Sequence, residues 1–166
     1  MGTEIERKFV LRAAPEWVAE AEGSPILQGY LAASGESEVR LRLIAGRPLL
    51  TVKLGHGLAR RETEIELDEG QFERLWPLTE GRRIEKNRFI LPHGVYRIEL
   101  DVYKGGLEGL VTAEVEFPSE QESEKFDPPS WFGKDISEDE GFKNKNLAVF
   151  GLPGQWGKRS RRKRHG

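Results

Sequence analysis

Charged and apolar residues alternate along eight segments of this 166-residue chain, and this alternation restricts the folds that it can adopt. A period of two is typical of a β-strand with one apolar and one polar face. Turn signals such as Pro92-His93-Gly94 separate several neighbouring segments by only a few residues, which favours an antiparallel meander over a parallel sheet. The predicted strands are residues 3–10, 26–33, 37–46, 47–55, 58–67, 82–91, 95–103 and 110–117.

Three further segments predict short helices, at residues 68–76, 119–126 and 137–150. The first is amphipathic and stops before a proline. The second and third open on Ser119 and Ser137, each followed three residues later by a glutamate, which is the spacing of a capping box. Helices of this length are expected to cover a sheet rather than to form a bundle of their own.

The chain is predicted to form one domain over residues 1–152, followed by a tail over residues 153–166, because no repeat or linker interrupts the strands. The last nine residues, 158–166, hold six lysines or arginines and no acidic residue. We expect this basic stretch to be a disordered, solvated end, with attraction to a polyanion as the alternative.

Composition excludes several kinds of site. Without cysteine the chain has no disulfide, no thiolate zinc site and no cysteine nucleophile. No apolar run approaches the ~20 residues that span a bilayer, and the N-terminus lacks a signal-peptide core, so we expect a cytoplasmic protein without a membrane partner. His56, His93 and His165 fall in predicted turns or in the tail, so none is expected to bind a metal.

The polar faces of the predicted strands are almost wholly ionic, and their signs are segregated by strand. An ordinary half-exposed sheet would explain any one strand, but like charges placed together destabilise a sheet unless something binds between them. The acidic strands carry Glu4 and Glu6, then Glu62, Glu64 and Glu66, then Glu99 and Asp101, then Glu114 and Glu116. The basic residues on the same faces are Lys8, Arg40, Arg42, Lys53, Lys86 and Arg88.

An eight-stranded sheet can close into a barrel whose interior accommodates one small ligand. We therefore predict an α+β fold in which a closed antiparallel barrel has a charged interior and short helices packed outside. Crowded carboxylates without histidine or cysteine favour a hard divalent cation, Mg²⁺ or Mn²⁺. Six arginines and lysines exceed the need of one monophosphate, which indicates a polyphosphate. Neither a P-loop nor a GxGxxG fingerprint is present, so side chains must hold the phosphates.

The order of these motifs resembles that of the CYTH proteins, also called triphosphate tunnel metalloenzymes. The ExExK sequence at residues 4–8 is the hallmark of that family. It is followed in the family's order by RLR at 40–42, TVK ending at Lys53, ETE at 62–64, EKNR at 85–88, ELD at 99–101 and EVE at 114–116. The resemblance spans residues 1 to about 152 and is closest to the short, single-domain bacterial members.

The resemblance implies metal-dependent hydrolysis of a triphosphate, with inorganic tripolyphosphate as the expected substrate and two Mg²⁺ or Mn²⁺ ions as cofactors. It implies catalytic roles for Glu4, Glu6 and Lys8. The implied metal-facing residues are Glu4, Glu6, Glu64, Asp101, Glu114 and Glu116, with Glu62 in an alternative alignment. The implied phosphate-binding residues are Lys8, Arg40, Arg42, Lys53, Lys86 and Arg88. A late basic residue is also expected near the tunnel, and Lys134, Lys143 and Lys145 are the candidates.

Other functions and assemblies remain open at the level of sequence. Thiamine triphosphate or ATP could be the substrate, and the family also includes class IV-type adenylate cyclases, although no base-recognition signature is evident. A non-catalytic polyphosphate-binding module is a third hypothesis, and no nucleic-acid partner is expected. Trp17, Trp76, Trp131 and Phe132 could pack in the core or at the interface of a homodimer.

Overall fold

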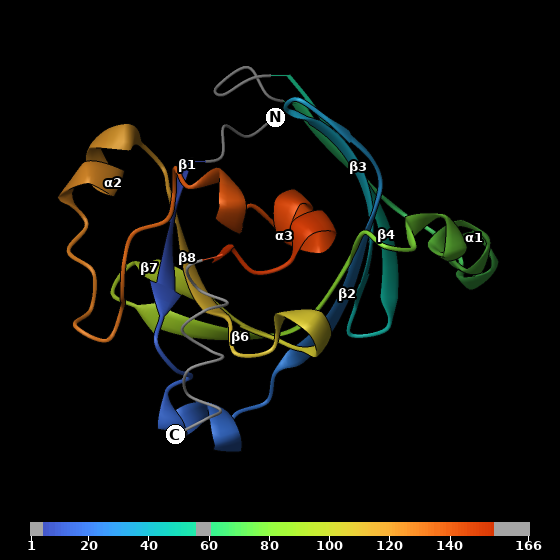
Figure 1. The fold of residues 1–166 in the computed structure, drawn as a ribbon. Helices are drawn as coiled ribbons and strands as arrows, with labels where there is room; N and C mark the ends of the chain where they lie inside the picture. The colour runs from blue at the N-terminus through green and yellow to red at the C-terminus, as the bar shows by residue number, and fades with distance from the viewer. Residues whose placement is uncertain (1–4, 56–60, 155–166) are drawn as a thin grey trace.

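The computed structural model describes residues 5–55 and 61–154, and one antiparallel sheet of eight strands dominates it (Figure 1). Predictions about Glu4, His56 and the basic stretch 158–166 lie outside the described residues. All eight predicted strands are present, which confirms the predicted fold class. Their bounds are β1 Ile5–Leu11, β2 Ser24–Ser34, β3 Ser37–Ile44, β4 Arg47–Leu54, β5 Arg61–Glu66, β6 Arg83–His93, β7 Tyr96–Tyr103 and β8 Val111–Phe117.

In the segments of the chain that the structure describes, three short α-helices and several 3-10 turns connect or cover the strands. The α-helices are α1 Glu69–Leu75, α2 Glu120–Lys125 and α3 Asn144–Phe150. The 3-10 turns are η1 Glu16–Glu20, η3 Trp76–Thr79, η4 Gly105–Leu107 and η5 Glu140–Phe142. Within residues 5–55 and 61–154, no helix combines the length and the apolar character needed to cross a membrane.

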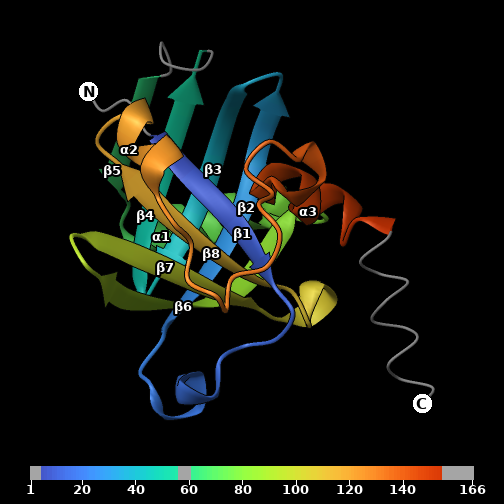
Figure 2. The same ribbon diagram turned by 90° about the vertical axis from the view of Figure 1, so that its left-hand side faces the viewer.

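The strand order is β1-β8-β7-β6-β2-β3-β4-β5, so β1 and β5 are the two ends of the sheet. The sheet curves strongly around α3, as Figures 1 and 2 show, but no ladder joins β1 to β5 in the described part of the chain. The predicted closure into a barrel is therefore incomplete there. The physical reason lies at the outer edge of β1, where residues 133–136 already occupy backbone groups of Lys8 and Val10.

The cross-strand register places the charged faces of seven of the strands, all except the uncharged β2, on the concave side of the sheet. In an antiparallel ladder, residues directly opposite each other point to the same face. Continuous rows of such pairs run across the curved sheet. They include Lys8 opposite Glu114 and Glu114 opposite Glu99, Asp101 opposite Arg88, and Lys53 between Glu38 and Glu62.

The convex face of β1, β6, β7 and β8 is apolar and forms one of the two cores. Phe9, Ile98 and Leu100 are at most 1% exposed in this core. The segment that follows α2 covers them with Phe126 and Phe132, and Phe132 packs 4.9 Å from Phe9 between ring centroids. This agrees with the prediction that apolar faces point outward beneath helices and loops.

The second core lies on the concave side, which corrects the prediction that all helices pack outside. Tyr30, Ile84 and Tyr103 point inward from the central strands β2, β6 and β7, and Leu147 of α3 packs against them. Figure 1 shows α3 between the two flanks of the curved sheet. The inner face is therefore partly ionic and partly apolar, and α3 removes the apolar part from water.

The predicted helix over residues 137–150 is also corrected. Ser137 does not cap a helix, because its Oγ accepts a hydrogen bond from the backbone N–H of Lys8 at 2.9 Å. The side chain of Asp139 caps the 3-10 turn η5 instead, and α3 begins only at Asn144. By contrast, Ser119 caps α2 as predicted, through the backbone N–H of Glu122.

Candidate active site

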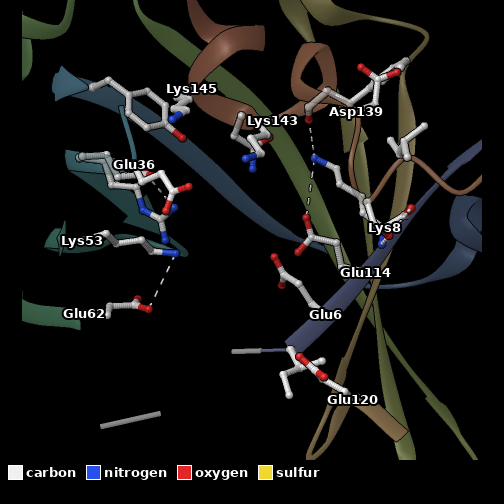
Figure 3. Close-up of a pocket in the computed structure, with 18 residues that line it drawn as sticks. Glu6, Lys8, Glu36, Lys53, Glu62, Glu114, Glu120, Asp139, Lys143 and Lys145 are labelled. Atoms are coloured by element: carbon white, nitrogen blue, oxygen red, sulfur yellow. Dashed lines mark hydrogen bonds and ion pairs between the residues drawn. The ribbon is translucent and has the colours of Figure 1, made fainter. Parts of the chain in front are cut away.

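A cavity of about 580 Å³ lies on the concave side of the sheet (Figure 3). Strands β1 and β8 form one wall and β3, β4 and β5 form the other, while residues 136–145 supply a third wall. Of the residues that the sequence assigned to metal or phosphate binding, six line the cavity: Glu6, Lys8, Arg40, Lys53, Glu62 and Glu114. The cavity thus combines residues from both the metal-facing and the phosphate-binding predictions.

The three predicted cations in the cavity form loose ion pairs with acidic neighbours. Lys8 Nζ lies 3.7 Å from Glu114 Oε1, and Lys53 Nζ lies 3.8 Å from Glu62 Oε2. Arg40 Nη1 lies 3.6 Å from Glu38 Oε2. All three distances exceed the 2.7–3.2 Å range of a good N–H···O bond. These three ion pairs are therefore looser than a direct hydrogen bond, and Lys8 Nζ also donates to the carbonyl of Phe142 at 2.7 Å.

Glu6 and Glu114 are the acidic pair on the opposite side of the cavity from Glu62. They come from neighbouring strands, and Figure 3 shows both carboxylates turned into the cavity across from Lys53 and Glu62. Among the described residues, no three acidic or histidine side chains are arranged to hold a metal ion by themselves. Glu4, which sequence analysis places on the same face, lies outside the described residues.

The predicted metal residues Glu64 and Glu116 lie outside the cavity. Glu116 is opposite Glu6 in the register but lines an adjacent hollow of about 560 Å³, together with Glu99. Glu64 lies on the exposed strand β5, where its carboxylate accepts a hydrogen bond from the hydroxyl of Thr51 at 3.4 Å. The sequence left open whether Glu62 or Glu64 belongs with the metal-facing residues. Of these two glutamates, Glu62 is the one that lines the cavity.

Lys86, Arg88 and Asp101 form an ionic network beside the cavity rather than in its lining, and Arg88 Nη1 also pairs with Glu99 Oε2 at 3.1 Å. Lys86 Nζ donates to Asp101 Oδ2 at 2.8 Å, and Arg88 Nε donates to Asp101 Oδ1 at the same distance. Arg88 Nη2 adds a third bond to Asp101 Oδ2 at 2.9 Å. Both Lys86 and Asp101 are 1% exposed. The carboxylate of Asp101 is thus engaged by two cations of the chain itself.

Burial and charge act in opposite directions on the pKa values of this network. Burial opposes ionisation of Asp101, but the charge and hydrogen bonds of Lys86 and Arg88 outweigh it and hold the pKa of Asp101 well below its usual range. Burial lowers the pKa of Lys86 to about 8, against the opposing effect of Asp101. At neutral pH the network therefore carries one negative and two positive charges.

Arg42 adds a fourth ionic side chain next to this network. It is 9% exposed, and its Nε has no hydrogen-bond partner in the described part of the chain. Burial, followed by repulsion from Arg40 and Arg88, lowers the pKa of Arg42 to about 10. Since Arg42, Lys86 and Arg88 face two carboxylates, those of Asp101 and Glu99, the region behind the cavity keeps a small excess of positive charge.

The third wall contains two of the three late lysines named as candidates, because Lys143 and Lys145 line the cavity whereas Lys134 does not. It also contains lining residues that were not predicted, such as Ser137 and Asp139. Lys145 Nζ donates to the carbonyl of Gly35 and so ties α3 to the turn between β2 and β3. Local alternation could not identify these residues because the wall is not a strand.

Tyr30 was not predicted but also lines the cavity, and its position agrees with strand alternation. It lies opposite Arg40 in the ladder between β2 and β3. Its hydroxyl accepts a hydrogen bond from Gln28 Nε2 at 2.7 Å, and burial raises the pKa of Tyr30 to about 12. The side chain is therefore neutral at physiological pH. Because the side chain of Tyr30 carries no charge, the pattern of charged residues does not identify it.

The chain is similar to curated proteins over most of its length. It is 47% identical over 150 residues to an inorganic triphosphatase from Nitrosomonas europaea, a match that covers 89% of this chain and 97% of the relative. The chain belongs to the inorganic triphosphatase family. An inorganic triphosphatase from Acetivibrio thermocellus is 36% identical over 149 residues, which cover 89% of this chain and 94% of that protein. No family model matches the chain.

A solved inorganic triphosphatase shares the fold. Its crystal structure aligns with a TM-score of 0.70 and 42% sequence identity, covering 93% of this chain and 99% of the other. The likeness to the inorganic triphosphatase family therefore includes both the curved sheet and the segments that follow it. The fold is thus that of a known enzyme family.

Proposed function

We propose that this chain hydrolyses inorganic triphosphate to pyrophosphate and phosphate, by attack of water on a terminal phosphorus, and that it requires a divalent cation. The observation that carries the proposal is one cavity in which Lys8 lies beside the acidic pair Glu6 and Glu114 on one wall, while Arg40 and Lys53 belong to the opposite wall. The names of the relatives support the same activity. The resemblance of the motifs supports placing the chain among the CYTH proteins.

The residues of the cavity fit a hard cation bound together with phosphates. Mg²⁺ keeps several waters and is usually held by one or two carboxylates plus substrate phosphates, rather than by a cage made of protein alone. Glu6 and Glu114 supply two such carboxylates, and we propose them as the main ligands, with Glu4 as a third. Mg²⁺ or Mn²⁺, in one or two copies, suits these oxygen donors. When bound, the cation neutralises phosphate charge and acidifies the attacking water.

The side chains of the cavity perform the remaining steps of the proposed reaction. Lys8 and Arg40 bind phosphate oxygens from opposite walls and stabilise the charge on the transferred phosphoryl group, a reaction in which catalysis is mostly placement and electrostatics. Lys53 binds the far end of the triphosphate. A glutamate of the cavity that is not engaged with the cation accepts the proton of the attacking water.

The buried network acts indirectly in this proposal. Asp101 holds Lys86 and Arg88 in place, and these two residues with Arg42 supply positive potential behind the cavity. This assigns Asp101 a positioning role in place of the metal-facing role that the motif resemblance implies. It also makes Arg42, Lys86 and Arg88 supporting cations rather than first contacts of the phosphates.

Within residues 5–55 and 61–154, the cavity lacks a suitable stacking surface, which favours an inorganic substrate over ATP or thiamine triphosphate. Tyr30 and Phe142 are the aromatic residues in the cavity lining, and they are only 2% and 8% exposed. Neither offers an open ring face to a nucleobase or a thiazolium ring. The same argument counts against an adenylate cyclase, which must hold the adenine during the reaction.

A phosphate-release panel tests the proposal. Tripolyphosphate, ATP, thiamine triphosphate and pyrophosphate are each assayed with Mg²⁺, with Mn²⁺ and with a chelator. We expect rapid release from tripolyphosphate only when metal is present, and its loss in Glu6→Gln, with Glu73→Gln on the exposed face of α1 as a matched control. Tight binding of tripolyphosphate without phosphate release would instead show a binding module, and cyclic AMP formed from ATP would show a cyclase.

A further inference from the structure

The outer edge of β1 is covered by a segment from the C-terminal third of the chain. Gly133 N–H donates to the carbonyl of Val10 at 2.9 Å, and the amide of Val10 donates to the carbonyl of Lys134 at 3.0 Å. Ile136 N–H donates to the carbonyl of Lys8 at 2.8 Å. The segment therefore lies along β1 like an additional short strand, directly behind the residue that the proposed reaction uses to bind phosphate.

Arg7 fastens this segment from the convex face of β1. Its Nε donates to Asp135 Oδ2 at 3.1 Å, and its Nη1 donates to the carbonyls of Ser123 and Phe126 at 3.0 and 3.1 Å. The guanidinium also lies over the ring of Phe9, 5.0 Å from its centroid. Because side chains alternate along a strand, Arg7 points away from the cavity that Glu6 and Lys8 line.

Asp135 relays this contact to the backbone of Lys8 through Ser137. Its Oδ1 accepts hydrogen bonds from both the backbone N–H and the hydroxyl of Ser137. The Ser137 hydroxyl oxygen in turn accepts from the backbone N–H of Lys8 at 2.9 Å. One carboxylate thus connects the guanidinium of Arg7 to the residue that follows it in β1.

The same segment also holds the ammonium group of Lys8. After Ser137 the chain turns through η5, and the carbonyl of Phe142 accepts a hydrogen bond from Lys8 Nζ at 2.7 Å. Lys8 is therefore attached to the segment at both its backbone and its side chain. A shift of residues 133–142 would move the ammonium group relative to the cavity.

We propose that Arg7 and Asp135 are positioning residues that set the place of Lys8 in the active site by holding residues 133–142 against β1. Neither side chain touches the cavity, so both act through Lys8. The inference rests on the proposed function only in treating Lys8 as a ligand of phosphate. It assigns a role to the residue between the glutamate and the lysine of the ExExK motif, a position at which the motif specifies no residue type.

The test is a double-mutant cycle on the affinity for tripolyphosphate, measured by calorimetry with the chelator present so that hydrolysis does not interfere. Arg7→Met keeps a long apolar stem over Phe9 but removes the guanidinium. We expect it to weaken binding about tenfold, since small displacements of a positioned group have effects of this order or larger. In a Lys8→Met background the same substitution should change affinity less than twofold.

Two further variants guard against a merely structural effect. Asp135→Asn keeps the size of the half-exposed side chain and should weaken binding in the same direction, again only when Lys8 is present. Arg47→Met breaks the exposed ion pair between Arg47 and Glu66 and should leave the affinity unchanged. Equal losses in the presence and absence of Lys8, or wild-type affinity in Arg7→Met, would overturn the proposal.

Hydrogen exchange provides a reading that does not depend on the substrate. In Arg7→Met the amides of Gly133 and Ile136 should exchange faster than in the wild type, while those of β3 and β4 should not change. Unchanged exchange at both amides would overturn the positioning role even if tripolyphosphate is not the substrate. A wild-type protein that binds tripolyphosphate without hydrolysing it would refute the proposed function and leave this inference standing.

Discussion

At the scale of single residues, Asp101 is the carboxylate that compensates the charges of two neighbouring cations. It accepts hydrogen bonds from both Lys86 and Arg88 in a region almost closed to solvent. Removing one partner of a buried ionic group is costly because the remaining charges lose their compensation. The residue is thus expected to matter for folding as much as for the active site, although it stands in a motif that is associated with metal binding.

Asp101→Asn should lower the free energy of unfolding by about 3–5 kcal/mol, because it leaves the buried Lys86 ammonium without a counter-charge. Urea denaturation at neutral pH measures the change. Glu66→Gln is the matched control, since the Glu66 side chain is 67% exposed in its ion pair and should change stability by less than about 0.5 kcal/mol. A loss below 1 kcal/mol in Asp101→Asn would contradict the proposed role of the network.

The depressed pKa of Asp101 also predicts how stability depends on pH. A carboxyl whose pKa is lower in the folded than in the unfolded state contributes stability above the unfolded value of about 3.9, and this contribution is lost as the pH falls below it. The free energy of unfolding of the wild type should therefore fall between about pH 4 and pH 2 more steeply than that of Asp101→Asn. Parallel curves for the two proteins would show that Asp101 is not ionised in the fold.

At the scale of elements, the segment behind β1 replaces the strand partner that a closed barrel would provide. A Cβ atom on Gly133 would lie 2.3 Å from the carbonyl oxygen of Val10, so only glycine allows this approach. The segment then supplies Ser137, Lys143 and Lys145 to the cavity. The end of the sheet and the third wall of the active site are therefore built by the same contact.

Gly133→Ala should destabilise the protein by about 1–3 kcal/mol, the usual cost of forcing an extra group into a packed contact. Thermal and urea denaturation measure this, and the affinity for tripolyphosphate should fall together with stability because the third wall moves. Gly106→Ala is the control, since no atom lies within 4 Å of the added Cβ and the change should be small. Equal stability of the two variants would show that residues 133–136 do not depend on close contact with β1.

At the scale of the whole molecule, the curved sheet collects charges from many strands around one space. Lys8, Arg40 and Lys53 come from β1, β3 and β4, and Glu62 and Glu114 come from β5 and β8. Repulsion among these like charges is tolerable when a ligand of mixed charge binds between them. Ligand binding should then stabilise the fold as a whole rather than one local region.

Tripolyphosphate should raise the Tm by an amount that grows with the logarithm of its concentration above Kd. At a ligand concentration of about 100 times Kd the gain is about 2.7 kcal/mol, which corresponds to roughly 5–10 °C for a domain of this size. Differential scanning fluorimetry measures the shift, and Arg40→Met should reduce it while Arg47→Met should not. A similar shift with sulfate at the same concentration would indicate only general anion binding.

The alternation of charged and apolar residues was sufficient to predict the strands and the inner face of each. Alternation is a local property that survives in the fold, and the ladders confirm that Lys8, Arg88 and Lys53 face inward as predicted. The hairpin turns could be predicted for the same reason. At the turn between β3 and β4, for example, Ala45 and Gly46 both adopt positive φ, as a tight hairpin requires.

What local patterns could not predict depends on contacts between residues far apart in the sequence. The capping-box spacing at Ser137 is real, but the hydroxyl binds the backbone of Lys8 because β1 offers an unpaired N–H at that position. Similarly, α3 has an apolar stripe, but its place on the concave side follows from Tyr30, Ile84 and Tyr103, which face inward from the central strands β2, β6 and β7.

The sequence by itself therefore determined which side chains face inward, and hence that this protein gathers carboxylates and cations in one interior. The tertiary structure decided which of them meet a ligand. Six predicted residues line the cavity, whereas Asp101 binds Lys86 and Arg88 beside it, and Lys143 and Lys145 enter from the C-terminal segment. The physical reason is that alternation sets the face of a strand, while strand order, curvature and long-range hydrogen bonds set which faces come within reach of one another.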